Sequence, residues 1–274
     1  MIGIRNDVTL GAQASLSGTN KALETSQERL ASGKRVNSAA DDAAASALIS
    51  QFAAQITGSD QGMRNISDGV SLFQTAESGV AQIDDMVQRV RDLSLQSLNG
   101  TLSDSGRASL QSEVGELQEQ ITQTTQNTSF NGIQLLQQDG SLAIQAGANT
   151  SDSIAVGTYD VQGKLGDLGF ASIDISTAAG ATSALGVLDQ TSDYLGGIQG
   201  EYGAVQNRFE SAMSNLQESN LNAVAARGRI EDADYARESA QQASSLIQQQ
   251  ANIAMQGQAS RISSQYVTQL LGNG

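Results

Sequence analysis

The stretch "LDQTSDYLGGIQGEYGAVQNRFESAMSNLQESNLNA", residues 188–223, repeats a seven-residue pattern of mostly apolar side chains. Such a repeat draws one apolar stripe along a helix and is typical of helices that wind around a partner. The first repeat position holds Leu188, Leu195, Tyr202, Phe209, Leu216 and Ala223, and the second holds Ile198, Val205, Ala212 and Ser219. We therefore expect a long helix here that packs against another long helix.

A second repeat, nearer the N-terminus, supplies a partner of similar length. Its positions are Phe52, Ser59, Ile66, Phe73, Val80 and Val87, with Ile49, Ile56, Met63 and Val70 beside them. A helix over about 42–98 would be roughly 80 Å long at the standard rise of about 1.5 Å per residue. A third amphipathic helix is predicted over about 103–128, where apolar residues also recur at helical spacing.

The segment from about 130 to 181 changes character, because Asn131-Gly132 and Asp139-Gly140 interrupt the helical pattern. Within it, "SLAIQAGANTSDSIAVGTY" (141–159) alternates apolar and other residues on both sides of a turn rich in Gly, Asn, Ser and Asp. This pattern predicts a β-hairpin. The expected fold class is mainly α, with long coiled-coil-like helices and one small β-hairpin.

Both ends of the chain carry helical stripes made largely of small residues. The N-terminal stripe is Ile2, Thr9, Leu16, Leu23 and Leu30, and the C-terminal stripe is Ala236, Ala240, Ala243, Ile247, Ala251 and Ala254. Helices with so little apolar bulk are marginal on their own, since most helical stability comes from tertiary packing. We therefore expect other parts of the assembly to cover these terminal helices.

The composition excludes most enzyme chemistries. The 274 residues include no Cys, His, Pro or Trp, which rules out disulfides, thiolate or imidazole catalysis and His-based zinc sites. A formal charge of −14, from 15 basic and 29 acidic residues, argues against nucleic acids and anionic membranes as partners. We assign no catalytic residue, no cofactor and no metal. No cleavable leader or membrane-spanning run is signalled, so the chain is expected either to stay in the cytoplasm or to leave by another route.

The stretch "RGRIEDADYA" (227–236) concentrates charge and has two interpretations. Asp232 and Asp234 could act as the acid and base of a hydrolase, but such a pair needs a concave, water-excluding site with further polar partners. Alternatively, the two arginines end the long helix and an aspartate caps the next helix. We favour this charged joint, and "SGKRVNSAADDAA" (32–44) predicts a matching joint after the first helix.

Six segments carry a family resemblance, in order and from both ends of the chain. They are "SGKRVNSAADDAA" (32–44), "MRNISDGVSLFQTAESG" (63–79), "QRVRDLSLQSLNG" (88–100), "NTSFNGIQLL" (127–136), "QNRFESAMSNL" (206–216) and "ARGRIEDADYA" (226–236). Together they resemble the signature segments of bacterial flagellins over nearly the whole chain. Because the middle is short, the chain resembles a flagellin without large variable outer domains.

The resemblance implies an inner domain of paired terminal helices, joined by spokes to an outer helical domain. The implied segments are 1–32 with 236–274 for the inner domain, 33–44 with 226–235 for the spokes, and 45–225 for the outer domain with its hairpin at about 141–159. The implied inner assembly residues are Leu16, Leu23, Leu30, Ala240, Ala243, Ile247, Ala251 and Ala254. The implied spoke residues are Arg35, Asp41, Asp42, Arg227, Arg229, Glu231, Asp232 and Asp234.

The function that the resemblance implies is a structural, non-enzymatic subunit that self-assembles into the extracellular flagellar filament for swimming motility. The implied partners are further copies of the chain in a helical homo-polymer, an export chaperone of the type III route, the filament cap and the hook-filament junction proteins. Some similar flagellins are bound by Toll-like innate immune receptors, and the residues matching that motif are Gln88, Arg89, Leu93 and Glu113. On a helix, Leu93 is expected to share an exposed edge with Gln88 and Arg89. The alternative functions are a flagellin-like hook-filament junction protein and, more remotely, a carboxylate-dependent hydrolase.

Overall fold

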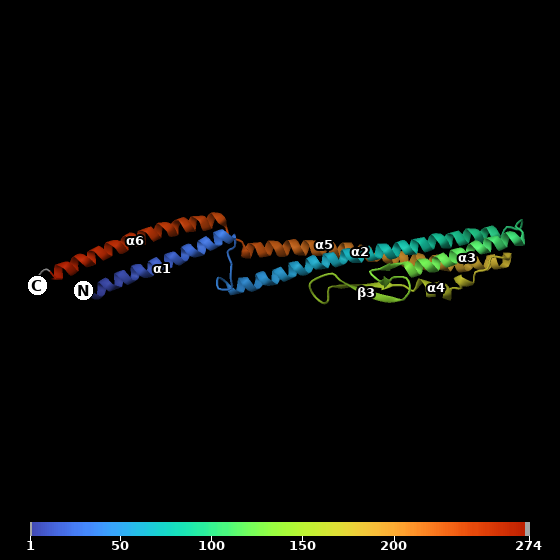
Figure 1. Ribbon diagram of the computed structural model, residues 1–274, viewed down its shortest axis with the longest axis horizontal. Coiled ribbons are helices and arrows are strands. Elements are labelled where there is room, and N and C mark those ends of the chain that lie inside the picture. Colours follow the sequence, from blue (N-terminus) through green and yellow to red (C-terminus); the bar gives the residue numbers. More distant parts are fainter. Residues whose placement is uncertain (1, 272–274) are drawn as a thin grey trace. The chain divides into compact units, whose positions relative to one another are not determined.

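The structure, a computed structural model, describes the backbone of residues 2–271 and the side chains of residues 10–262, 264, 265 and 268. Its long helices are α1 (Ile2–Ser32), α2 (Ala43–Ser97), α3 (Asp104–Asn127), α5 (Ala178–Glu231) and α6 (Tyr235–Leu271). The short elements are β1 (Ser129–Phe130), β2 (Ile133–Gln134), β3 (Gly140–Gln145), β4 (Ser153–Thr158), α4 (Val161–Asp167) and the 3-10 helix η1 (Phe170–Ser172). The chain is mainly α, as predicted (Figure 1).

The chain divides into two compact units. The terminal unit comprises the residues up to Ala54 together with those from Asn222 onward, and the central unit comprises Gln55–Leu221. Each long heptad helix, α2 and α5, therefore contributes to both units.

The central unit has a continuous apolar core built from the two heptad repeats. The repeat positions Ile66, Phe73, Val80, Val87, Leu188, Leu195, Tyr202 and Phe209 are all at most 1% exposed. Phe73 of α2 lies between two aromatic rings of α5, with ring centroids 5.4 Å from Tyr202 and 5.8 Å from Phe209. The predicted pairing of the two repeats is therefore confirmed, and aromatic contacts reinforce it at its centre.

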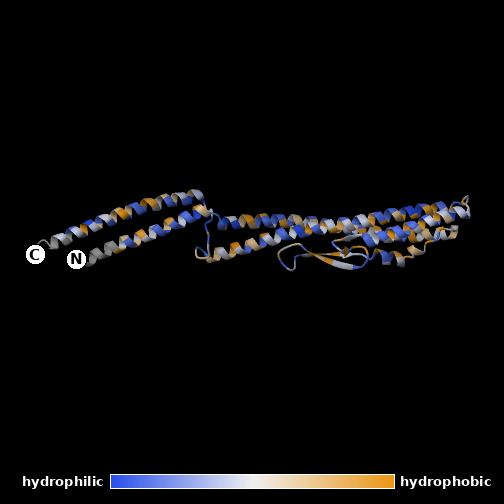
Figure 2. Cartoon of the chain, in the orientation of Figure 1, coloured by the Kyte–Doolittle hydropathy of each residue, from blue (hydrophilic) through white to orange (hydrophobic). Residues whose placement is uncertain are grey.

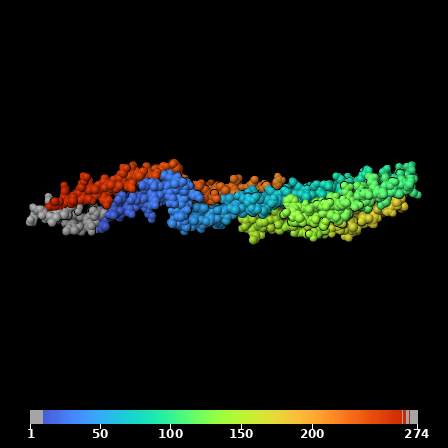
Figure 3. Space-filling model, viewed as in Figure 1, coloured from blue at the N-terminus to red at the C-terminus, as the bar shows by residue number. Residues whose placement is uncertain are grey.

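Helix α3 packs against α2 after a short turn, and its side chains lie directly against those of α2 in the space-filling view (Figure 3). Ser103 caps α3 by accepting a hydrogen bond from the amide of Gly106. The buried guanidinium of Arg107 donates to the carbonyls of Ser97 at 2.9 Å, Asn99 at 3.1 Å and Leu102 at 2.7 Å. Because the last carbonyls of a helix lack partners within it, Arg107 closes the end of α2.

Two antiparallel hairpins follow α3. Strands β3 and β4 pair from Gly140 opposite Thr158 to Gln145 opposite Ser153, which confirms the predicted hairpin. The smaller β1–β2 hairpin was not predicted; its turn consists of Asn131 and Gly132, with φ of 49° and 80°. Positive φ at both central residues is typical of a two-residue hairpin turn, so the Asn-Gly pair forms a strand turn in addition to ending the helical pattern.

The terminal unit pairs α1 with α6 along their length (Figure 1). Among the described side chains of these two helices, the buried ones are Thr19, Ser26 and Ser245. No large apolar side chain is buried in the described part of either helix, and apolar residues recur along the exposed surface of α6 (Figure 2). The two units therefore share helix pairing but differ in what the pairing buries.

Candidate functional site

The seam between α1 and α6 is polar. On α1 the predicted residues Leu16, Leu23 and Leu30 are half-buried, and they alternate with the buried Thr19 and Ser26 at heptad spacing. The amide of Asn252 donates to the hydroxyl of Thr19 at 3.2 Å, the amide of Gln249 donates to Asn20 Oδ1 at 2.7 Å, and Arg29 pairs with Glu238 at 3.1 Å. Hydrogen bonds, rather than apolar contacts alone, therefore hold the register of the pair.

The face of α6 that contacts α1 is not the predicted alanine-rich face. The predicted residues Ala240, Ala243, Ile247, Ala251 and Ala254 are all exposed. Between residues 238 and 252 the half-buried or buried residues Glu238, Gln242, Ser245, Gln249 and Asn252 are spaced by four and three, and Ser239 beside them is also half-buried. Apolar periodicity, on which the predicted assembly residues rest, does not reveal this polar seam. The recurrence of Gln, Ser and Asn at heptad spacing was the signal that could have revealed it.

The exposed face of α6 carries large apolar side chains. Its exposed members are Tyr235, Leu246, Ile247, Ile253, Met255 and Ile262, of which Tyr235 and Ile247 are 69% and Met255 is 65% exposed. Exposed apolar clusters on soluble proteins commonly mark surfaces that another molecule covers. These residues, called the α6 stripe below, are distributed around the exposed side of α6, and they are therefore the strongest candidate for an interaction site in the terminal unit.

Glu231 is the centre of the charged joint in the terminal unit. Its side chain is 12% exposed and pairs with Lys34 at 2.6 Å and with Arg227 at 3.3 Å. The amide of Arg35 donates to the Glu231 carbonyl at 2.6 Å, and the Arg35 guanidinium donates to the Ile230 carbonyl at 2.7 Å. The chain segments that follow α1 and end α5 are thus tied together by both ionic and backbone contacts. Several of the predicted spoke residues meet here.

The remaining acidic residues of the joint act mainly as caps. Asp41 accepts hydrogen bonds from the amides of Ser38 and Asn37. These bonds, chiefly the one from Ser38, hold the pKa of the Asp41 carboxyl below its usual range. Asp42 accepts from the amide of Ala45 at the start of α2, and Asp234 accepts from the first amides of α6. Asp42 and Asp234 thereby satisfy amides that have no partner within α2 and α6, whereas Asp41 satisfies amides of the loop before α2.

The other two predicted spoke residues have different settings. Helix α5 continues through Arg229, whose side chain is exposed, instead of ending at the two arginines. Asp232 follows the helix, and its backbone forms an isolated antiparallel bridge with Lys34. The break between α5 and α6 is therefore shorter than the sequence suggested.

The predicted receptor-motif residues do not all lie on one exposed surface. Gln88 and Arg89 are exposed, and the Arg89 guanidinium donates to Glu113 Oε1 of α3 at 2.7 Å and 3.0 Å. The expectation that Leu93 shares this edge was wrong, because Leu93 is only 2% exposed and belongs to the core. Both α3 and α5 cover α2 here, so its buried face is wider than that of a two-helix seam. Leu95, 50% exposed, is the apolar residue two positions away that reaches the surface.

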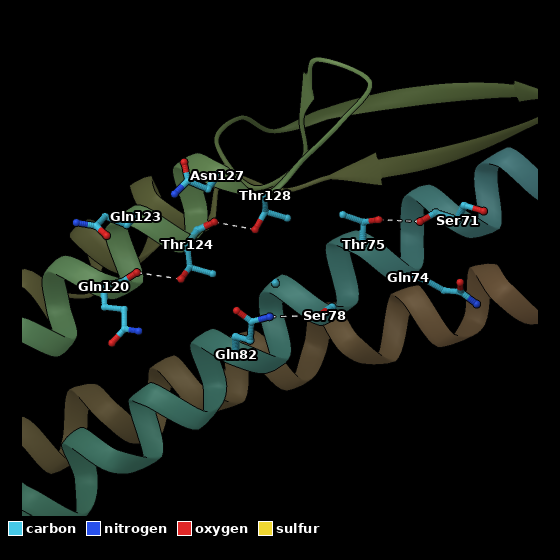
Figure 4. Close-up of a pocket in the computed structure, with 11 residues that line it drawn as sticks. Ser71, Gln74, Thr75, Ser78, Gln82, Gln120, Gln123, Thr124, Asn127 and Thr128 are labelled. Atoms are coloured by element: carbon cyan, nitrogen blue, oxygen red, sulfur yellow. Dashed lines mark hydrogen bonds between the residues drawn. The ribbon is translucent and has the colours of Figure 1, made fainter.

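A groove of about 670 Å³ lies between α2 and α3 in the central unit. Figure 4 shows amides of Gln74 and Gln82 on α2 and of Gln120, Gln123 and Asn127 on α3 around it. None of its lining residues is charged. A groove without a titratable group offers no acid or base at neutral pH, and its serine and threonine hydroxyls have no base in the lining to activate them. It lies in the central unit, whereas Asp232 and Asp234 belong to the terminal unit.

Two further observations concern ligands and membranes. Within the part of the chain that the structure describes, no group of three or more His, Cys, Asp or Glu side chains is arranged to hold a metal ion. Among the described helices, none combines the length and the apolar character needed to cross a bilayer.

Comparison with known proteins identifies the family. A model of the bacterial flagellin N-terminal helical region matches residues 5–141, and one of the flagellin C-terminal helical region matches residues 172–271. A flagellin of Listeria monocytogenes is 31% identical over 98% of this chain and 98% of its own length. The chain belongs to the bacterial flagellin family. This flagellin is accordingly a structural, non-enzymatic subunit of the extracellular flagellar filament, which serves motility and forms by polymerisation.

Solved structures share the fold. The crystal structure of Bacillus cereus flagellin has a TM-score of 0.51 at 24% identity, covering 59% of this flagellin and 94% of the other chain. A putative flagellar hook-associated protein from Vibrio parahaemolyticus has a TM-score of 0.60 at 16% identity, covering 70% and 100%. At these identities the likeness concerns the fold alone. The fold is thus common to a flagellin and a hook-associated protein, whereas the sequence match is to flagellins.

Proposed function

We propose that this flagellin polymerises mainly through its terminal helix pair, which forms the inner layer of the filament. In this scheme residues 1–32 and 236–274 form the inner domain, 33–44 and 226–235 form the spokes, and 45–225 form the outer domain. The observation that carries the proposal is the set of large apolar side chains left exposed on α6, with Ile247 at 69% exposure. A neighbouring copy of the chain would cover them.

The energetic argument compares the isolated subunit with the polymer. Burying a large apolar side chain completely contributes roughly 1.5–3 kcal/mol, so several exposed residues per subunit provide a strong drive toward association. A head-to-tail contact that does not close into a ring generates an open helical array. Burying the stripe only in the polymer couples the ordering of the terminal helices to assembly.

In this scheme the predicted assembly residues on α1 make contacts within the subunit, and those on α6 make contacts between subunits. Leu16, Leu23 and Leu30 are half-buried beside the polar seam and support the α1–α6 pair within one subunit. The exposed Ile247 and its alanine neighbours on α6 remain available for other subunits. The polar seam thus fixes which helix faces meet inside the subunit, and the apolar stripe is left for contacts between subunits.

The spoke residues would transmit load between the two proposed domains. Glu231 joins the segment after α1 to the end of α5 through Lys34, Arg227 and Arg35. The side chain of Glu231 is 12% exposed, so removing one of its ion-pair partners should cost more free energy than it would at a fully exposed residue. We expect this joint to keep the two segments together while the filament bends.

Export and capping partners complete the proposal. The chain would leave the cell unfolded through the flagellar type III route with an export chaperone, and it would assemble beneath the filament cap next to hook-filament junction proteins. The absence of Cys and Pro suits this route, since neither disulfides nor slow prolyl isomerisation interrupts refolding. Toll-like receptor binding, where it occurs, would use Gln88, Arg89 and Glu113, with the exposed Leu95 in place of the buried Leu93.

Seeded assembly tests the proposal and its junction-protein alternative. Purified chain is mixed with short filaments of the same protein, and growth is followed by sedimentation and electron microscopy. A filament subunit should elongate its seeds in bulk, whereas a junction protein should add at most to filament ends.

Substitution at Ile247 then tests the assembly surface. Ile247→Asp should abolish elongation, because a charge would be buried without a partner between subunits. Ile247→Leu, which keeps the side chain apolar, should elongate seeds like the parent chain. Equal elongation by the Asp and Leu variants would contradict the role assigned to the α6 stripe.

A further inference from the structure

One face of α2 in the central unit consists of small or amide-bearing residues. Gly58, Gly62, Asn65 and Gly69 are spaced by four, three and four, so they lie on a single stripe of the helix. This stripe is separate from the heptad core positions, which include Ser59 and Ile66. Hairpin β3–β4 and its turn lie against the stripe, as the next contacts show.

The contacts between the stripe and the hairpin are close. A Cβ atom added at Gly62 would lie 2.8 Å from the carbonyl carbon of Ala146 and 2.9 Å from the amide nitrogen of Gly147. A Cβ atom added at Gly58 would lie 2.9 Å from Ala148 Cα and would overlap Ala148 Cβ. Real Cβ atoms essentially never approach other heavy atoms so closely, so only glycine allows the turn to rest on the helix backbone.

A hydrogen bond fixes the hairpin at this depth. Asn65, one turn after Gly62, donates from its side-chain amide to the carbonyl of Gln145 at 2.9 Å. Ala146 is buried, and its amide donates to the carbonyl of Asp152 across the turn at 2.7 Å. The last residues of β3 are thereby held both to their own hairpin and to α2.

We propose that Gly58 and Gly62 are positioning residues that form a seat on α2 for the turn of the β3–β4 hairpin, with Asn65 fixing its depth. Glycine lowers helix propensity, so two glycines one turn apart inside a long helix need a packing reason. The seat supplies it and sets where the exposed residues Asn149, Thr150 and Ser151 stand on the subunit. This inference concerns the isolated chain and does not depend on how the subunit polymerises.

Glycines elsewhere in the helices provide the contrast. A Cβ added at Gly115 of α3 or at Gly186 of α5 would meet nothing within 4 Å. Alanine at such an open position should strengthen the helix, because it removes the conformational freedom of glycine from the unfolded chain. Alanine at the seat should do the same for the helix but displace the hairpin.

Hydrogen-deuterium exchange of the full-length monomer, read on peptides that cover residues 140–158, tests the seat. Gly58→Ala and Gly62→Ala should each raise the exchange rate of the hairpin amides about tenfold or more, as expected for an overpacked contact. Gly115→Ala is the matched control and should leave hairpin exchange unchanged. Circular dichroism verifies that every variant keeps the parent's total helical content, and exchange of peptides that cover residues 55–70 verifies that α2 stays helical.

A compensating substitution distinguishes two reasons for glycine at position 58, namely close packing of the hairpin turn and flexibility of the helix. Ala148→Gly removes the methyl group that would meet the new Cβ at residue 58. The double variant Gly58→Ala with Ala148→Gly should therefore recover part of the parent's hairpin protection, because the close contact with the Cα of residue 148, at 2.9 Å, remains. Parent-like exchange in both single seat variants, or no recovery in the double variant, would overturn the proposal.

Discussion

The central and terminal units both consist of paired helices, but they bury different kinds of residue. In the central unit Phe73, Tyr202 and Phe209 are almost completely buried and in ring contact. Among the described side chains of α1 and α6, the buried ones are Thr19 and Ser26 on α1 and Ser245 on α6. The difference teaches that one unit buries its large apolar side chains within the subunit, while the other leaves such side chains exposed, as our proposed assembly surface requires.

This division has a physical basis in what each seam can contribute alone. A fully buried apolar core gains transfer free energy and dispersion contacts inside the monomer. A polar seam gains little net free energy, because its hydrogen bonds replace hydrogen bonds to water. It nevertheless specifies register, since a shift would leave Asn252 and Thr19 without each other. The register of the terminal pair is therefore specified within the subunit, and in the proposed scheme most of its stabilisation comes from neighbouring subunits.

The largest effect is expected from deleting residues 237–274. The deletion removes most of α6 while the heptad helix α5 remains intact up to Glu231. Seeded polymerisation should be lost completely, because the apolar stripe on α6 is gone. The central unit should keep its unfolding midpoint in urea. Sedimentation of seeded full-length and truncated chains at equal concentration measures the first outcome, and circular dichroism measures the second.

Two results would break the comparison at this level. Robust filaments from the truncated chain would show that the central unit carries assembly by itself. A truncated chain whose central core no longer unfolds cooperatively would show that the terminal pair stabilises the monomer as well.

The next largest effect is expected from Phe73→Ala, which empties the aromatic centre of the central unit. Large-to-small changes of a buried phenylalanine cost about 3–5 kcal/mol of unfolding free energy. Leu23→Ala, at a half-buried position of α1, is the comparison variant and should shift the same transition by less than about 1 kcal/mol. Urea denaturation of both monomers, monitored at 222 nm as the usual helical signal, gives the two values. Similar values would remove the energetic contrast between the units.

The apolar core of the central unit could be predicted from the sequence, because heptad repeats rich in large apolar residues indicate a buried helix face. Ile66, Phe73, Leu195 and Phe209 are buried as their spacing required. The hairpin was predictable because alternation and turn residues occur together in 141–159. Both predictions rest on short-range periodicity, which the sequence displays directly.

Other features depend on contacts with segments that are distant in the sequence, and the periodicity of one helix does not indicate such contacts. Leu93 became buried because a third helix widens the covered face of α2. The side of α6 that meets α1 carries the buried Ser245 together with Gln249 and Asn252, which hydrogen-bond to α1, whereas the predicted assembly alanines of α6 face away. The seat at Gly58 could not be predicted, because the contact of Gly58 with Ala148 of the hairpin turn joins residues that are far apart in the sequence.

A smaller effect is expected at alkaline pH and only in the central unit. Burial first, and then the charges of Asp139 and Asp160, raise the pKa of Tyr194 to about 12. Burial also raises the pKa of Tyr202 strongly. Both phenols stay protonated in the folded chain, whereas unfolded tyrosines ionise near pH 10. Above about pH 10 the unfolded state therefore binds fewer protons, and the free energy of unfolding falls as pH rises toward about 12.

The measurement is urea unfolding at pH 9 and pH 11 for the parent chain and for Tyr202→Phe. The parent should lose roughly 1 kcal/mol more between these pH values than the variant, which has no phenol to ionise at this position. Tyr235 is 69% exposed in the terminal unit, and Tyr235→Phe should behave like the parent. An equal pH effect in the parent and Tyr202→Phe would show that this burial does not govern the alkaline response.

The smallest effect is expected at the Arg89–Glu113 pair, on the surface of the central unit. The two side chains are 55% and 44% exposed, and exposed ion pairs contribute about 0–1 kcal/mol because water and salt screen them. Arg89→Ala, Glu113→Ala and the double variant form a cycle whose coupling free energy in monomer unfolding should be below about 1 kcal/mol. The same cycle read by seeded elongation reports on contacts between subunits. Since monomer stability is nearly unchanged, a loss of elongation in either single variant would mark this surface as a second assembly contact. Parent-like elongation in all three would sharpen the comparison, because assembly would then depend on the terminal pair and not on this exposed edge.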